Sequence, residues 1–136
     1  MSMSKKSLPV WKIKGLSLPF KYDFDDLESM ESYEAIFKNM DKKTSEMKNC
    51  KTRAEGIKVY CDAFFEAFDC LFGEGTADKL FQGKYNMKTC DSVYEQYIKF
   101  VSECVAATDQ SRLQKFQRYL GKKPSDHKHK KKPYHA

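Results

Sequence analysis

Histidines, the residues most often used as general bases and metal ligands, occur only at the C-terminal end of this 136-residue chain, as His127, His129 and His135. The pair His127 and His129 could hold a transition metal, but lysines surround it and no cysteine or carboxylate completes a defined ligand set. We expect adventitious metal binding at most, and no metal cofactor. Because residues 1–126 contain no histidine, a histidine-activated nucleophile is not expected there. The sequence therefore predicts a protein without catalytic residues, not an enzyme.

Three glycines near a lysine suggest a phosphate-binding loop, in which backbone N–H groups and a lysine hold the anion. The glycines are Gly73, Gly75 and Gly83, and Lys84 follows the last of them. A phosphate loop requires Ser or Thr after the lysine, whereas Tyr85 stands here, and the pattern GxGxxG is also absent. Helix capping and turn formation are the favoured roles of these glycines, and no nucleotide cofactor is expected.

The five cysteines indicate packing rather than disulfide bonds. Their number is odd and no CxxC pair occurs. The N-terminal sequence lacks the apolar stretch of a secretory signal, and no apolar run is long enough to cross a membrane. We expect an intracellular protein in which cysteines stay reduced. Cys61 and Cys104 fall on apolar helical positions and are expected to be buried.

The net charge of +6 is concentrated at the C-terminal end. Residues 112–136 contain nine Lys and Arg against one Asp, a net charge of +8, so residues 1–111 carry −2. From residue 121 onward apolar side chains are too few to form a core, which predicts a disordered basic tail over 121–136. Its candidate polyanion-binding residues are Lys128, Lys130, Lys131 and Lys132. Nucleic acid is not the favoured partner, because the acidic body would repel it.

Alternating apolar residues predict a β-hairpin over residues 10–24. One strand is expected from Val10 to Lys14 and the other from Leu18 to Phe24, with a turn at residues 15–17. Pro19 has no N–H to donate, which confines the second strand to a sheet edge at that point. Because an isolated hairpin is marginally stable, it should dock on the helices or pair with another chain.

Two stretches after the hairpin carry apolar residues at helical spacing. The first is expected near residues 25–48 and begins at an acidic cluster that suits a helix N-terminus. The second has the strongest pattern in the chain, from Ile57 to Phe72, and Gly73 is expected to end it. The following residues 73–86 are predicted to form a structured connection, in which Thr76 caps a short turn.

A third long helix is expected after this connection. Its cap is predicted to be Thr89 or Asp91, or a capping box of Ser92 and Glu95. The apolar pattern lapses after residue 105 and returns at Leu113. The sequence leaves open whether the helix continues or breaks near residues 108–109.

These elements predict a mainly α fold, a small three- to four-helix bundle with an N-terminal β-hairpin and a disordered basic C-terminal tail. Residues 1–9 are expected to be a flexible N-terminus. Residues 10–120 are expected to form a single domain, with the hairpin at 10–24 and the helical bundle at 25–120.

Such a bundle has more aromatic residues than its core needs and can offer a hydrophobic groove to amphipathic helices. Phe65 lies beside the main apolar stripe and Phe81 lies in the connection, so both are expected to be exposed and to bind protein. Met30, Met40 and Met47 would make such a surface adaptable. The alternative, that these methionines fill a small core, is the favoured one.

The order of hairpin, helices and glycine-bounded connection resembles a family of small tail-gene proteins of tailed phages of Gram-positive bacteria, which is similar to siphophage tail assembly chaperones. The resemblance covers about residues 10–120. It rests on the segments FKYDFDDLESMESYEAIF, FFEAFDCLFGEGTADKLFQGKYN and CDSVYEQYIKFVSE. LFGEGTADKLF is the most particular part of these.

The resemblance implies a non-enzymatic protein of the host cell cytoplasm that binds the long helical tape measure protein and recruits tail tube protein during tail morphogenesis. In that family a longer, frameshifted form commonly adds a C-terminal domain. Two alternatives are retained: a structural virion subunit of the tail or head-tail connector, and a basic-tailed nucleic-acid-binding accessory protein. Self-association is left open, and no membrane partner is expected.

Overall fold

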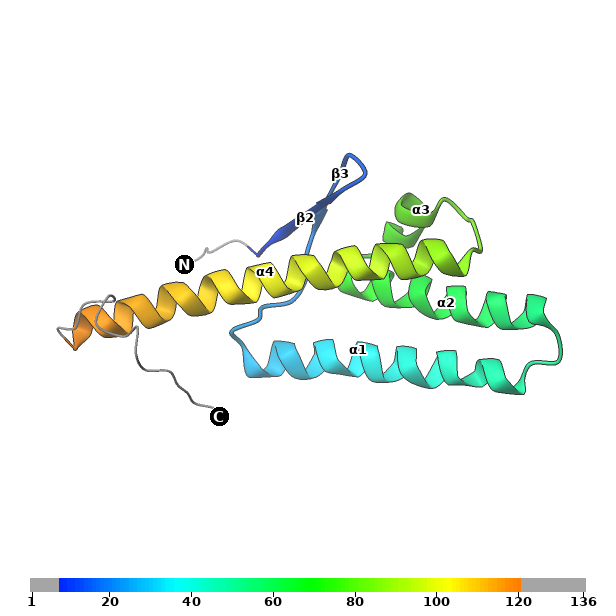
Figure 1. Cartoon of the computed structure of the whole chain (residues 1–136), viewed down its shortest axis with the longest axis horizontal. Coiled ribbons are helices and arrows are strands. Elements are labelled where there is room, and N and C mark those ends of the chain that lie inside the picture. Colours follow the sequence, from blue (N-terminus) through cyan, green and yellow to red (C-terminus); the bar gives the residue numbers. More distant parts are fainter. Residues whose placement is uncertain (1–7, 121–136) are drawn as a thin grey trace. The chain divides into compact units, whose positions relative to one another are not determined.

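A computed structural model of the chain describes residues 8–120 and consists mainly of helices (Figure 1). Its elements are β2 (Val10–Ile13), β3 (Leu16–Pro19), α1 (Leu27–Ser45), the 3₁₀ helix η1 (Glu46–Asn49), α2 (Arg53–Phe72), α3 (Thr76–Phe81) and α4 (Met87–Tyr119). The predicted fold class, a small helical bundle with an N-terminal β-hairpin, is confirmed. The predicted basic tail at 121–136 and the first seven residues of the predicted flexible N-terminus lie outside the described residues.

The chain divides into two compact units, the first ending at Phe100 and the second beginning at Val101. Within the described residues, the first unit contains the hairpin, α1, η1, α2, α3 and the beginning of α4, and the second contains the remainder of α4. The single domain expected over residues 10–120 stays a prediction.

The hairpin is shorter and its turn tighter than the sequence predicted. Val10 pairs with Pro19 and Ile13 with Leu16, which leaves a two-residue turn at Lys14 and Gly15. Both turn residues have positive φ, 54° and 77°, as the turn type that matches the twist of a β-hairpin requires. The predicted turn at residues 15–17 and the predicted second strand reaching residue 24 are therefore wrong. Lys14 and Gly15 alone form the turn, because both adopt positive φ.

Helix α1 begins where the acidic cluster predicted a cap. The backbone N–H of Ser29 donates to Asp26 Oδ2 at 2.8 Å, which satisfies one of the free N–H groups at the helix start. The helix passes at its C-terminal end into η1, so the expected single helix over 25–48 is two consecutive elements.

Helix α2 carries the apolar stripe that the sequence predicted. Its N-terminus is capped by Thr52, whose hydroxyl oxygen accepts from Glu55 N–H at 3.1 Å. Gly73 ends it with φ of +120°, a backbone conformation that residues with a Cβ rarely adopt. Eight residues of α2 are buried, Gly56, Cys61, Ala63, Phe64, Ala67, Phe68, Leu71 and Phe72. This helix therefore supplies the centre of the core.

The caps of α3 and α4 differ from those predicted. Gly75 occupies the position before α3, and Thr76 is the buried first residue of that helix rather than its cap. Helix α4 begins earlier than expected, and Asn86 Oδ1 accepts from Thr89 N–H at 3.0 Å. The capping roles predicted for Thr89, Asp91, Ser92 and Glu95 are therefore wrong. Helix α4 is continuous to Tyr119, which decides between the two expected alternatives.

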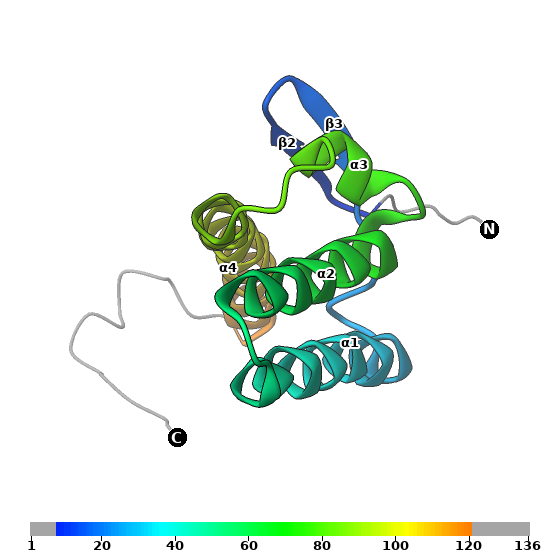
Figure 2. The ribbon, with the colours of Figure 1, turned by 90° about the vertical axis from the view of Figure 1, so that its right-hand side faces the viewer.

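Aromatic rings from three elements form the core of the first unit. The ring of Trp11 lies 5.4 Å from that of Phe72, 6.0 Å from that of Phe68 and 5.6 Å from that of Tyr97, measured between centroids. These contacts join β2, α2 and α4. Figure 2 shows the hairpin and α3 on one side of α2 and α1 on the other. The hairpin therefore docks on the helices, as its size requires.

Candidate functional site

Helix α1 presents an apolar face that its neighbours cover only in part. None of its residues is buried, although apolar side chains recur along it at helical spacing. Tyr33, Phe37 and Met40 are half-buried. In a globular protein such a face normally packs into the core. The half-covered face of α1 thus leaves hydrophobic surface available to another molecule.

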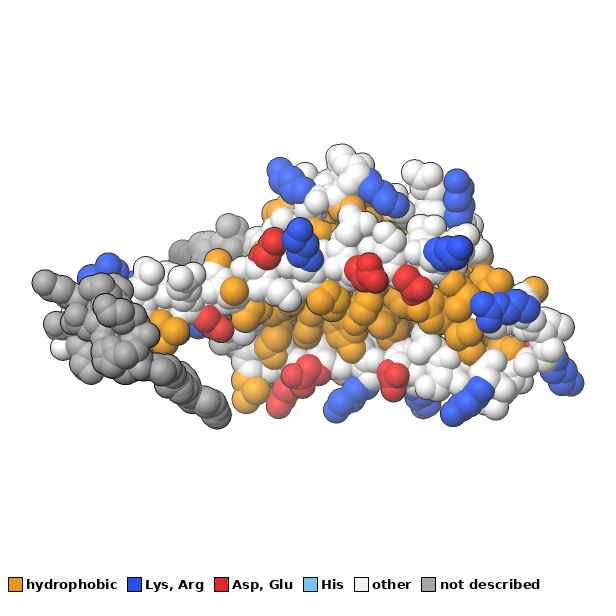
Figure 3. Space-filling view, in the orientation of Figure 1, with side chains coloured by type: hydrophobic (Ala, Val, Ile, Leu, Met, Phe, Trp, Pro, Cys, Tyr) orange, Lys and Arg blue, Asp and Glu red, His pale blue; other side chains and the backbone are white. Residues whose placement is uncertain are grey.

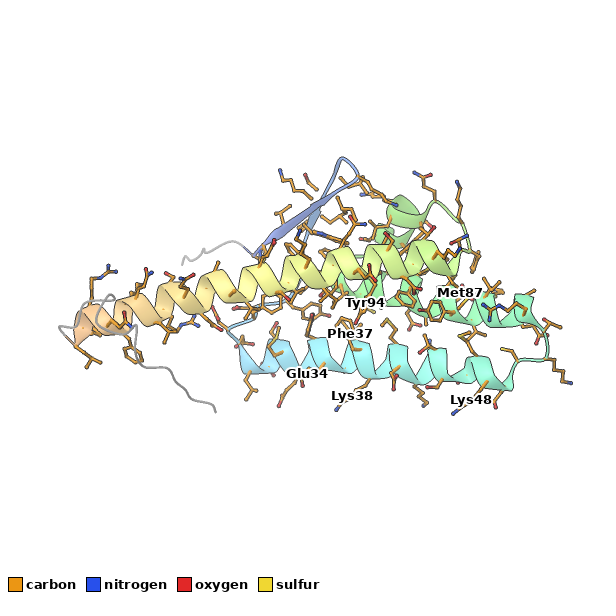
Figure 4. All side chains as sticks on the ribbon, viewed as in Figure 1. Glu34, Phe37, Lys38, Lys48, Met87 and Tyr94 are labelled. Atoms are coloured by element: carbon orange, nitrogen blue, oxygen red, sulfur yellow. The ribbon has the colours of Figure 1, made fainter. Side chains whose placement is uncertain are left out.

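The half-covered face of α1 continues onto α4. Figure 3 shows hydrophobic side chains in a strip between these two helices, and Figure 4 places Phe37 and Tyr94 on its two sides, with Met87 near one end. Met87 and Tyr94 are half-buried, and the rings of Phe37 and Tyr94 lie 6.4 Å apart. We call Tyr33, Phe37, Met40, Met87 and Tyr94 the apolar strip.

Side chains of α2 pack against the α4 side of the strip. The ring of the buried Phe64 meets that of Tyr94 edge-on at 5.6 Å, and the Tyr60 ring lies 4.8 Å from that of Phe64 in a tilted arrangement. The Tyr60 hydroxyl donates to Asp91 Oδ1. These contacts hold the α4 side of the strip against α2.

A polar contact fixes α1 on α2. The Lys43 ammonium donates to Glu66 Oε1, and Asn39 Nδ2 donates to Glu66 Oε2 at 3.4 Å. All of these groups are at least partly accessible, so the pairing fixes position more than it adds stability. Helix α1 is thereby held beside α2 while its apolar face stays half-covered.

The strip is neutral at physiological pH. Burial raises the pKa of Tyr94 above its ordinary value. Burial also raises the pKa of Tyr33, and this effect exceeds the lowering by its hydrogen bond with Tyr97. Both phenols therefore stay protonated. Charged residues occur at the edge of the strip, where Figure 4 shows Glu34 and Lys38 on α1 and Lys48 on η1.

Phe81 is not the surface residue that the sequence predicted. It is 2% exposed, and its ring lies 4.9 Å from that of Phe65 and 5.8 Å from that of Phe68. The reason is that α3 folds back on α2, where Asp69 Oδ1 accepts from Ala77 N–H at 2.8 Å. Phe65 is half-buried under Phe81 and under Tyr85, whose ring is 5.0 Å away.

The three predicted methionines all lie on or just beyond α1 and are half-buried. Met40 belongs to the apolar strip. The Cε atom of Met47 is 3.8 Å from the position that a Cβ at Gly56 would occupy, so Met47 packs against the beginning of α2. The predicted polyanion-binding lysines at 128 and 130–132 and the His127–His129 pair lie outside the described residues.

Tyr33, Phe37, Met87 and Tyr94 are strip residues that were not predicted from the sequence as binding residues, whereas Met40 was. Tyr94 and Tyr97 are three residues apart, and the first is half-buried whereas the second is fully buried. Residues three apart lie on the same side of a helix, within the apolar stripe of an ordinary packed helix. Periodicity therefore gives no signal that separates the half-buried Tyr94 from the buried Tyr97.

Asp62, outside the strip, forms structural contacts with two neighbouring side chains. Asp62 accepts from the Tyr85 hydroxyl at 2.6 Å and from the Lys58 ammonium at 2.9 Å. Burial alone would raise the pKa of Asp62, but these two hydrogen bonds lower it overall. Over residues 8–120, no group of three or more His, Cys, Asp and Glu side chains is placed to hold a metal ion.

Two of the cysteines meet inside the first unit. Cys61 and Cys90 are both fully buried, and burial raises the pKa of each thiol. Cys61 is buried as predicted, whereas Cys104 is half-buried. No helix in the described part of the chain combines the length and apolar character needed to cross a membrane.

Comparison with known proteins gives one match. Residues 15–134 match DUF6673, a family of unknown function. Searches of curated proteins and of solved structures each returned no match.

Proposed function

This chain belongs to the DUF6673 family, and we propose that it is a phage tail assembly chaperone that binds helical segments of the tape measure protein along the apolar strip. In this role it covers apolar surface of the tape measure protein in the host cytoplasm and recruits tail tube subunits around it. The proposed activity is binding of protein and involves no catalytic residue or cofactor. It draws on the resemblance of the sequence to tail-gene proteins and on the strip.

The half-covered face of α1 is the observation that supports this proposal most directly. A helix with an apolar stripe at three- and four-residue spacing can lie along the strip, over α1 and α4, and cover Phe37 and Tyr94 together. Complete burial of one such side chain is worth about 1.5–3 kcal/mol relative to full exposure. The strip side chains are already half-buried, so each gains only part of this on binding.

The chemistry of the strip favours a helical client over a small molecule. Its side chains are aromatic rings and thioethers, which adapt to different apolar partners. The edge of the strip along α1 carries both signs of charge. In the sequence, Glu34 lies between the strip residues Tyr33 and Phe37, and Lys38 follows Phe37. Mixed charges at the edge suit amphipathic helices of varied sequence, such as those of a long tape measure protein.

The test is co-expression of the full chain with a tape measure protein, followed by affinity capture. We expect Phe37→Glu to reduce the captured tape measure protein severalfold, because a carboxylate in the strip must be desolvated on binding. Ala35→Glu is the matched control, since residue 35 is an exposed position of the same helix. Equal capture by the two variants would contradict strip binding.

A structural virion subunit is the second candidate. Within the described residues β2 and β3 pair only with each other, so the hairpin has an edge to which a neighbouring subunit can add a strand. Mass spectrometry of purified particles separates the two functions. A structural subunit is present in stoichiometric amount, whereas a chaperone is nearly absent.

A further inference from the structure

The second unit carries an apolar stripe of its own. Leu113, Phe116 and Leu120 are spaced by three and four residues, which places them on one side of a helix. Their exposed fractions are 59%, 61% and 68%. We call these three residues the C-terminal stripe.

Such a stripe needs a partner to cover it. Helices in proteins obtain most of their stability from burial of an apolar side. Within residues 8–120 these three large apolar side chains stay more than half exposed, which favours another molecule as their packing partner.

We propose that the C-terminal stripe of one copy of this chain docks on the apolar strip of a second copy. Both surfaces are apolar and elongated, and each leaves its side chains incompletely covered. Because a single chain carries both, two copies can exchange their stripes reciprocally and close a symmetric dimer. The proposal uses the same strip as the proposed function, but does not depend on which client protein binds there.

Charge complementarity between the C-terminal region and the rest of the chain favours a second copy as the occupant. Residues 112–136 carry a net charge of +8 and residues 1–111 carry −2, so the C-terminal region of one copy is attracted to the body of another. Near the stripe the basic residues are Arg112, Lys115 and Arg118. On the α4 edge of the strip, the exposed residues Asp91 and Glu95 lie within one helical turn of Tyr94, whereas Lys38 and Lys48 lie at the opposite edge.

The test measures the molar mass of the full chain by size-exclusion chromatography with light scattering, over a range of concentrations and salt. We expect a dimer that weakens as salt increases. Phe116→Glu should raise the dissociation constant about tenfold or more. Ser111→Glu, two residues before Leu113 and so on a different side of the helix, should leave it unchanged. A wild-type chain that stays monomeric would overturn the proposal.

Mixing two variants distinguishes stripe-to-strip docking from pairing of two stripes. Phe37→Glu damages the strip only, and Phe116→Glu damages the stripe only, so each variant alone should be monomeric. Their mixture retains one intact strip and one intact stripe, and should form a heterodimer. If Phe37→Glu dimerises normally, or if the mixture stays monomeric, the proposal is wrong.

A second strip variant shows whether loss of the dimer reflects damage to the strip or a folding defect of Phe37→Glu. Met87→Glu changes a half-buried residue in the first turn of α4, and should weaken the dimer in the same way as Phe37→Glu. Circular dichroism checks that each variant keeps the helical content of the wild type.

Capture of the tape measure protein is measured separately with Phe116→Glu, which leaves the strip intact. A monomeric Phe116→Glu that still captures the client supports dimerisation through the stripe independently of the client. Dimer formation without client capture would contradict only the proposed function.

Discussion

The Tyr97 hydroxyl donates a hydrogen bond to the Tyr33 hydroxyl oxygen over 2.9 Å and so joins α4 to α1. Tyr97 is fully buried, while Tyr33 is half-buried at one end of the apolar strip. The ring of Phe37 lies 6.3 Å from that of Tyr97, so the same buried tyrosine supports two strip residues. Tyr97 therefore belongs to the core and also contacts two residues of the proposed binding surface.

We expect a double-mutant cycle of Tyr33→Phe and Tyr97→Phe to give a coupling energy of about 1 kcal/mol in the free energy of unfolding. The reason is that either change removes the hydrogen bond between the two hydroxyls without removing a ring. The measurement is urea unfolding followed by circular dichroism. Tyr119→Phe serves as the control, because Tyr119 is 89% exposed. A coupling energy near zero would show that this bond does not hold the two helices together.

Phe81→Ala is expected to lower the free energy of unfolding by about 3–5 kcal/mol. Phe81 is 2% exposed and lies between Phe65 and Phe68, so its removal leaves a cavity between α2 and α3. The midpoint of urea unfolding measures this loss.

Phe65→Ala is the informative comparison for Phe81→Ala. Phe65 is half-buried, so its truncation opens a smaller cavity and should cost clearly less. If both variants are destabilised equally, the burial of Phe81 does not set the stability of this region.

The Asp62 carboxylate should make stability depend on pH in the acidic range. Its pKa is lower in the folded chain than its ordinary value, because the hydrogen bonds from Tyr85 and Lys58 outweigh the effect of burial. A lowered folded-state pKa contributes stability above the unfolded-state pKa of about 3.9, and this contribution is lost as pH falls below it. We expect Asp62→Asn to destabilise the chain at pH 7 and to have little effect near pH 2. Thermal unfolding of the two proteins across this range tests the prediction, and a difference independent of pH would contradict it.

The sequence predicted the elements whose signals are local. The apolar residues from Ile57 to Phe72 repeat at a helical period over several turns, and Gly73 follows directly, so both the helix and its end were predicted correctly. Asp26 was likewise contained in the predicted acidic cap of α1. These features depend on neighbours within a few residues, which the sequence displays.

The position of Phe81 and the extent of the strip depend on tertiary packing. Helix α3 has only six residues, and its sequence does not reveal that it folds back on α2. The stripe of α1 has a helical period like that of α2, yet none of its residues is buried. Periodicity identifies an apolar face, but the degree to which that face is covered follows from where the other helices lie.

The beginning of α4 illustrates the same limit and gives the last prediction. Asn86, Thr89, Asp91 and Ser92 are all good capping residues, and only the path of the chain after α3 selects Asn86, whose side chain accepts from Thr89 N–H. Asn86→Ala should therefore lower the free energy of unfolding by about 1 kcal/mol. Ser92→Ala should change it by less, since residue 92 lies inside the helix and alanine has a high helix propensity. Urea unfolding of both variants measures the difference. A larger loss for Ser92→Ala would restore the capping box as the start of the helix.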